Sequence, residues 1–181
     1  MKPVGLGRNV FAYILALVLM SGCVIMEKNL WQAATSGDLT RVTVLLEQGD
    51  SARVADERGV TPLFLAAQHG HREVVALLLK HGASADRPRQ DGVTPLVTAI
   101  QEGHTEIVAL LLESGVDVNA RTSQIAGATL LHVAAYRGNQ EIVSLLLKHG
   151  GNKYAQMTSG ELPVDLARQQ GHTALIPLLT P

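Results

Sequence analysis

The chain has a single cysteine, Cys23, among its 181 residues. No intramolecular disulfide can form, and no cysteine-based zinc or redox site can be assembled. Aromatic residues are also scarce, at 3% of the chain, and Phe11 and Tyr13 lie within the hydrophobic start of the sequence. The remaining aromatic residues are too few to build a stacking platform for nucleic-acid bases or sugars.

Positive charge is not in excess. The chain has 15 Lys and Arg residues against 16 Asp and Glu residues, which gives a formal net charge of −1 with its seven histidines neutral. A chain without a basic surplus cannot neutralise a row of phosphates, so nucleic acid is not expected as a partner. Neither a serine or cysteine nucleophile in a strained turn nor a distinctive pair of carboxylates is recognisable, so the sequence predicts no enzyme.

The histidines raise the question of a metal site. His71, His104 and His172 each follow a glycine in the same short motif, whereas His81 and His149 share a Leu-Lys-His-Gly ending. A zinc site needs three or four ligands that converge, and residues in equivalent positions of a repeated structure are held apart. We therefore expect structural histidines, no metal and no cofactor.

The first 22 residues have the layout of a secretory signal. Lys2 and Arg8 lie near the start, eleven consecutive apolar residues end at Met20, and small residues follow. The sequence Met20-Ser21-Gly22-Cys23 resembles the lipobox of bacterial lipoproteins, in which the leader is cleaved before the cysteine, the cysteine is diacylated and the new amino terminus is acylated. This resemblance implies a signal peptide over residues 1–22, a lipidated Cys23 and a short tether over residues 23–29.

The tether would hold the following domain close to a membrane, because residues 24–29 span about 20 Å when extended. Residue 24 is Val rather than Asp, which resembles lipoproteins of the outer membrane of Gram-negative bacteria, and we expect an outer-membrane lipoprotein facing the periplasm. Two alternatives remain open. The apolar stretch from Val10 to Met26 could be an uncleaved inner-membrane anchor, although a spanning helix wants roughly 20 residues, and initiation at Met26 would give a cytosolic form.

A repeat follows the leader. The run Gly59-Val-Thr-Pro-Leu63, followed by Gly70-His71, returns 33 residues later as Gly92-Val-Thr-Pro-Leu96, followed by Gly103-His104. Self-similarity at this period, with T-P-L and G-H as its fixed points, indicates stacked helix pairs. Thr61 and Thr94 suit the position that caps the first helix of each pair, because a proline follows each of them.

These motifs resemble the ankyrin repeat. The resemblance implies an all-α repeat solenoid of about five units over residues 30–180, each a helix-turn-helix with a β-hairpin tip, in which the first and last units act as caps. We number as units 1 to 5 the residues 30–55, 56–88, 89–121, 122–156 and 157–180.

The resemblance also implies a concave binding face made of the tips and the inner ends of the first helices. Tyr136 and Arg137 are the foremost candidates there, because tyrosine and arginine often dominate interfaces. The unit 4 tip contains two extra residues near Ile125, so we expect it to protrude. His132 is expected to support its hairpin. The predicted partner-binding residues are Glu57, Arg58, Gln68, His69, Gln90, Asp91, Gln101, Glu102, Ile125, Tyr136 and Arg137.

The sequence thus predicts a membrane-tethered protein that captures a protein partner and is a monomer when unbound. Ankyrin-repeat lipoproteins that resemble this chain include immunity proteins that block phospholipases delivered into the periplasm by competing cells. The most specific hypothesis is therefore an immunity protein that neutralises a toxic lipase. The alternative is a scaffold or assembly factor for an envelope enzyme or a secretion component, and a bound enzyme that remains active would favour it.

Overall fold

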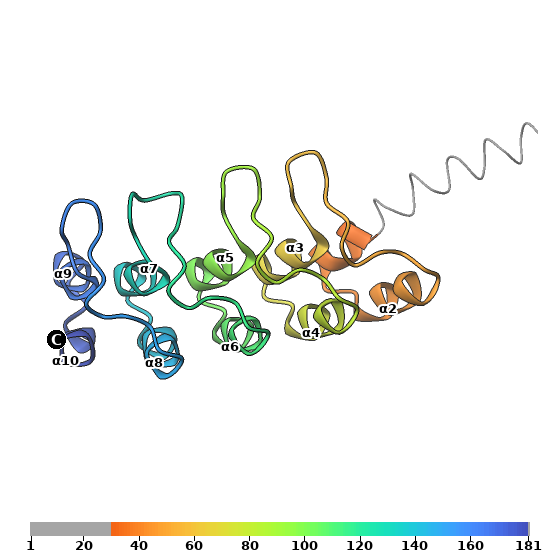
Figure 1. The fold of residues 1–181 in the computed structure, drawn as a ribbon. Helices are drawn as coiled ribbons and strands as arrows, with labels where there is room; N and C mark the ends of the chain where they lie inside the picture. Colours follow the sequence, from red (N-terminus) through yellow and green to blue (C-terminus); the bar gives the residue numbers. More distant parts are fainter. Residues whose placement is uncertain (1–29, 181) are drawn as a thin grey trace, which may run out of the picture.

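The structure is a computed structural model that describes residues 30–180, where paired helices follow one another in a single row (Figure 1). A helical segment over residues 30–36 opens unit 1. The predicted all-α repeat solenoid is confirmed. The first helices of units 2 to 5 are α3 (Pro62–Gln68), α5 (Pro95–Glu102), α7 (Leu130–Arg137) and α9 (Pro163–Gln169). The second helices of units 1 to 5 are α2 (Leu39–Glu47), α4 (Arg72–Lys80), α6 (Thr105–Glu113), α8 (Gln140–Lys148) and α10 (Ile176–Leu179), the last preceded by the 3-10 turn η1 (Thr173–Leu175).

The predicted signal peptide, the lipidated Cys23 and the internal start at Met26 lie outside the described residues. Among the helices that the structure describes, none is both long enough and apolar enough to cross a bilayer.

Four hairpin-shaped tips project from the same side of the row (Figure 1). Each is closed at its base by a backbone hydrogen bond, such as that from Asp56 N to Val60 O at 3.0 Å. The tips, as we use the word below, are residues 56–60, 89–93, 122–128 and 157–161. Within residues 30–180 the only β-type pairing is an isolated bridge between Arg121 and Thr129, so the tips are tight turns with almost no strand.

Threonine side chains cap the amino-terminal ends of two first helices. The Thr61 hydroxyl accepts a hydrogen bond from Phe64 N at 3.0 Å, and Thr94 does the same for Val97 N at 3.3 Å. The proline after each threonine has no N–H to leave unpaired in the first helical turn. At the other end of α5, Gly103 has φ of 81°, a left-handed conformation that ends the helix without strain. The predicted N-caps are therefore confirmed.

The core runs along the row because every unit buries apolar faces against its neighbours. Leu63, Leu96 and Leu131, which are equivalent residues of successive first helices, are at most 1% exposed. Of the leucine triplet in α4, Leu78 is fully buried and its two neighbours are half-buried. Burying a leucine side chain stabilises the fold by about 1.5–3 kcal/mol. Because these leucines are buried against neighbouring units, the contacts between units contribute to the core as well as those within each unit.

A second set of contacts joins the units at the base of the tips. The fully buried His132 accepts the Thr129 N–H at Nδ1, 3.1 Å away, and donates from Nε2 to Glu161 O in the tip of unit 5 at 3.1 Å. Trp31, in the equivalent position of unit 1, donates from Nε1 to Val60 O at 2.9 Å. Both rings therefore hold the tip of the following unit, whereas His132 was predicted to support its own hairpin.

Burial lowers the pKa of His132 below its ordinary value, an effect that Arg121 adds to and that the hydrogen bond to Glu161 O opposes. Since the unfolded chain takes up the proton first, the free energy of unfolding should fall as the pH drops through about 6.5. We expect the wild-type chain to lose more stability than His132→Phe between about pH 7.5 and pH 5.5, measured by urea unfolding of each. Equal losses in the two proteins would contradict this assignment.

Candidate partner-binding face

The G-H histidines hold each unit to the one before it. In each of units 1 to 4, a backbone carbonyl at the end of the first helix accepts a hydrogen bond from the next unit. In three of the four seams between units, the donor is Nε2 of the histidine in the G-H motif of that next unit. The pairs are His71 with Thr35 O at 2.8 Å, His104 with Gln68 O at 3.1 Å and His172 with Tyr136 O at 3.0 Å. These carbonyls lie at the ends of first helices, where no partner is available within the helix.

In the seam between units 3 and 4, the equivalent carbonyl, that of Gln101, is bonded by a different residue type. The G-H position of unit 4 holds Asn139, whose Oδ1 accepts from Ile142 N at 3.0 Å and so caps α8. The guanidinium of Arg137 donates instead to Gln101 O, with Nε at 2.7 Å. Arg137, a predicted partner-binding residue, therefore has a structural role in joining units 3 and 4. The sequence signal for this role is the asparagine in place of histidine, with an arginine two residues earlier.

Two other predicted residues are engaged within the tips. Gln90 donates from its backbone N to Arg58 O at 2.9 Å and from its side chain to Glu57 O at 2.5 Å. Asp91 forms an ion pair with Arg89, whose Nε lies 3.0 Å from Oδ1. The hydrogen bond from Arg89 lowers the pKa of Asp91. The side chains of Gln90 and Asp91 thus serve the contact between neighbouring tips and the shape of the tip itself.

The lengthened tip of unit 4 was expected to protrude, and this expectation is wrong. In Figure 1 its end is broad and flat and does not stand beyond the neighbouring tips. The chain turns back where Ala128 N donates to Ile125 O, and Ala126 O accepts from Thr158 N in the next tip at 3.1 Å. The two added residues are therefore absorbed sideways, against unit 5.

Gln124, the neighbour of Ile125, nevertheless contacts a first helix. The Gln101 side chain of α5 donates to the Gln124 side chain at 2.8 Å, so this tip reaches back over the preceding unit. Ile125, next to Gln124, remains 42% exposed. Gln124 was not predicted as a site residue, because a contact between a tip and a distant helix end has no sequence signal.

The remaining predicted residues keep their side chains available. Within residues 30–180, the side chains of Glu57, Arg58, Glu102 and Tyr136 are exposed and form no hydrogen bond or ion pair. Gln68 is half-buried, and the His69 ring lies 6.2 Å from that of His71. These residues form no recognisable catalytic group, and no cluster of three metal-ligating side chains occurs among the described residues.

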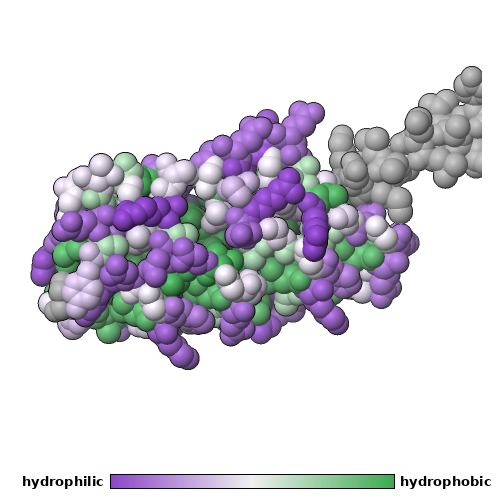
Figure 2. Space-filling view, viewed as in Figure 1, coloured by the Kyte–Doolittle hydropathy of each residue, from purple (hydrophilic) through white to green (hydrophobic). Residues whose placement is uncertain are grey.

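The character of the tips changes along the row. The tips of units 2 and 3 carry five charged residues, Asp56, Glu57, Arg58, Arg89 and Asp91, whereas residues 122–128 of unit 4 carry none. Figure 2 shows this contrast as strongly hydrophilic tips over the amino-terminal half of the row and paler ones over the carboxyl-terminal half. A partner that spans the face would meet charged tips in units 2 and 3 and an uncharged tip in unit 4.

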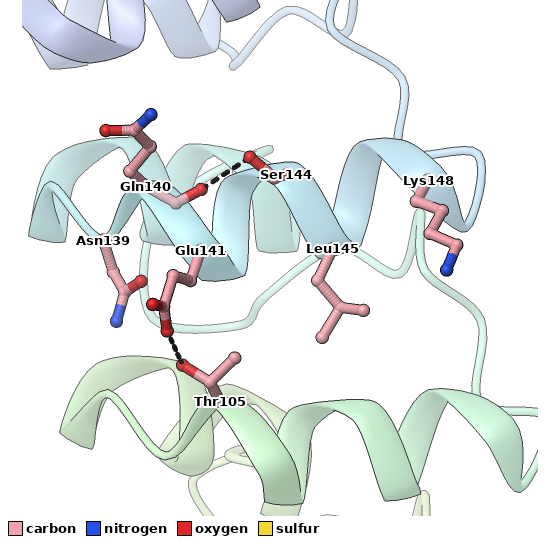
Figure 3. Close-up of a pocket in the computed structure, with 7 residues that line it drawn as sticks. All are labelled: Thr105, Asn139, Gln140, Glu141, Ser144, Leu145 and Lys148. Atoms are coloured by element: carbon pink, nitrogen blue, oxygen red, sulfur yellow. Dashed lines mark hydrogen bonds between the residues drawn. The ribbon is translucent and has the colours of Figure 1, made fainter.

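The second helices form a separate open groove between α6 and α8 (Figure 3). It has a volume of about 740 Å³, and the one hydrogen bond drawn across it joins Thr105 Oγ1 and Glu141 Oε2 at 3.4 Å. Ser144 is bound to its own helix through Gln140 O. Because no predicted binding residue lines this groove, it is distinct from the candidate face.

Comparison with protein families gives two matches. Residues 30–122 match a family model described as ankyrin repeats (3 copies), and residues 124–167 match one described as ankyrin repeats (many copies). A comparison with curated proteins finds no match.

The contact made by Arg137 predicts a stability effect. We expect Arg137→Ala to lower the free energy of unfolding by about 1 kcal/mol, because the Gln101 carbonyl loses its donor. Glu102→Ala, which removes a free side chain beside that carbonyl, should change it by less than about 0.5 kcal/mol. Chemical unfolding of both variants measures the difference, and equal effects would show that the Arg137 contact contributes nothing.

Proposed function

The chain belongs to the ankyrin-repeat family, whose members are typically non-catalytic scaffolds that bind proteins, and we propose that it captures a protein partner on the face formed by its tips and first helices. The observation that carries this assignment is Tyr136. Its side chain is 48% exposed and forms no hydrogen bond within the described residues, although helix α7 and the bond from His172 to its carbonyl fix its backbone. A rigidly mounted, exposed tyrosine suits an interface anchor.

The face offers a partner a defined set of groups. Ile125 and Tyr136 supply apolar area in unit 4, whereas Arg58 and Glu102 supply free charges in units 2 and 3. Arg137 contributes indirectly, since it fixes the end of α5 on which Gln101 and Glu102 lie. We therefore assign anchoring to Tyr136 and Ile125, and electrostatic steering to the charged tips.

We place this module at the membrane surface, as a lipoprotein of the outer membrane that faces the periplasm. The lipobox-like sequence ending at Cys23 and the preceding apolar segment support this location. Several acyl chains on one residue would give stable attachment where a single chain would not. The short tether before residue 30 would keep the binding face within reach of enzymes that act on lipid.

At the finest level, we propose an immunity protein that neutralises a delivered phospholipase. The resemblance to ankyrin-repeat lipoproteins of this type and the placement beside the lipid substrate of such a toxin support the proposal. An inhibitor of this kind acts by stoichiometric binding, which is consistent with a chain whose described residues show an open face and no catalytic group. A scaffold for a resident envelope enzyme is the alternative outcome of the tests below.

Tyr136→Ala should weaken partner binding by at least tenfold, since interface tyrosines commonly contribute about 2 kcal/mol. Its stability should stay within about 0.5 kcal/mol of the wild type, because the side chain is free. Tyr154→Ala is the matched control, as Tyr154 is 61% exposed but lies in the segment between α8 and the last tip. Titration calorimetry against the captured partner measures the effect, and equal affinities for the two variants would remove Tyr136 from the interface.

The partner is obtained by crosslinked capture from envelope fractions, with the intact protein and Cys23→Ser as parallel baits. A captured lipase is then assayed on phospholipid vesicles with and without the purified chain. Inhibition at one equivalent supports the immunity role. A captured enzyme that keeps its activity in the complex contradicts that role and supports the scaffold.

Mass spectrometry of the mature amino terminus tests the anchor. We expect an acylated Cys23 as the first residue of the wild-type protein, whereas Cys23→Ser should lack the acyl groups and retain residues 1–22. A product that begins at Met26 would contradict lipidation and show that the internal start is used.

A further inference from the structure

Rings occupy one equivalent position at most of the seams between units. Trp31 and His132 each donate to a carbonyl of the following tip, and Phe64 lies under the Arg89 guanidinium, 5.2 Å from the ring centroid. In unit 3 the equivalent residue is Val97. The seam between units 3 and 4 is therefore the only one of the four that lacks a ring from the preceding unit.

The following unit does not compensate for this loss. Thr122 holds the position in unit 4 that Arg89 holds in unit 3, so two smaller side chains replace the pair of Phe64 and Arg89. A cavity of about 210 Å³ lies in this seam. Its buried lining includes the apolar side chains of Leu96, Val97 and Leu130.

The polar group in the cavity wall is unsatisfied. Thr122 is 7% exposed, and among the described residues its hydroxyl has no hydrogen-bond partner. In unit 2 the equivalent residue, Asp56, accepts from Arg58 N and Val60 N inside its own tip. The longer tip of unit 4 leaves Thr122 without these donors. A buried hydroxyl without a partner is costly, which marks this seam as incomplete on its own.

The size of the cavity matches the missing group. A buried apolar cavity of about 150 Å³ is enough to bind benzene, so the seam has room for one six-membered ring. The ring would lie where Phe64 lies one unit earlier.

Charged groups surround the opening. Asp86 and Asp117 line the cavity and are exposed, and each has one carboxylate oxygen engaged, by Ser84 Oγ and Asn119 N respectively. The second carboxylate oxygen of each has no hydrogen-bond partner among the described residues. Arg121 also lines the cavity, and its guanidinium donates to Gln156 O at 3.2 Å. Two carboxylates against one guanidinium leave the cavity lining with an excess of negative charge, which favours a cationic group near the ring.

We propose that the seam between units 3 and 4 receives an aromatic side chain of the protein partner, from a segment in which a lysine or arginine neighbours the aromatic residue. The proposal rests on the proposed function only for the identity of the occupant. The inserted ring would complete the row of seam rings, and the adjacent cation would lie by Asp86 and Asp117.

The test uses three small phenols with the same ring: tyramine, which is cationic, p-cresol, which is neutral, and 4-hydroxyphenylacetate, which is anionic. Each is titrated into the full chain while the methyl NMR signals of Val97 and Leu130 are followed. We expect saturable shifts of these signals, with tyramine binding at least about threefold more tightly than 4-hydroxyphenylacetate. No saturable shift with any of the three would overturn the proposal, as would tighter binding of the anion.

Two substitutions locate the binding. Val97→Phe should fill the seam and abolish the shift of the Leu130 methyl signals, whereas Phe64→Val should open the preceding seam and produce a new shift at Leu63. If circular dichroism shows that Val97→Phe does not fold, Val97→Leu, which fills part of the space, should reduce binding at least about fivefold, since a lost cavity cannot admit the ring. Binding unchanged in the folded variant would overturn the assignment.

Tyr136→Ala separates this proposal from the partner-binding assignment. It should leave phenol binding unchanged, because Tyr136 does not line the cavity. Phenol binding that is lost in this variant would place the ring site elsewhere on the face and contradict the seam. Because the phenols are tested without any partner, failure of the proposed function leaves this readout intact.

Discussion

The structure depends on one constraint: the first helices end in backbone carbonyls that only the next unit can satisfy. His71, His104 and His172 meet this need in three seams, and Arg137 meets it in the fourth. Together with the apolar faces that only neighbours can cover, these bonds make each unit dependent on the next. The row of units follows from that dependence.

The same constraint decides which residues remain for function. The side chains of Gln90 and Arg137 are bonded to a neighbouring unit, and that of Asp91 is paired within its own tip. Tyr136 has the opposite arrangement, since its carbonyl is bound and its side chain is free. A rigid backbone with a free side chain is what an interface anchor needs. We therefore regard the free residues of the tips and first helices as the binding face.

Much of this could be predicted from the sequence because the repeat is strong. The period of 33 residues predicted the helix pairs, and Thr61 and Thr94 predicted where two first helices begin. The role of Arg137 was missed because it depends on a replacement at another position, Asn139. The protrusion of the tip around Ile125 was wrongly predicted from length alone, since length does not show that Ala126 is bound to the next tip. Such contacts between units leave no periodic pattern in the sequence.

Seam contacts make the described units one cooperative body in this account. Trp31 is the only tryptophan in the chain and donates to Val60 across the first seam, so its fluorescence reports on unit 1, whereas far-ultraviolet circular dichroism reports on all helices. The measurement is urea unfolding of the full chain followed by both signals. The two transitions are predicted to coincide, because unit 1 cannot unfold without breaking its contacts with unit 2. A fluorescence transition at clearly lower urea would contradict the claim.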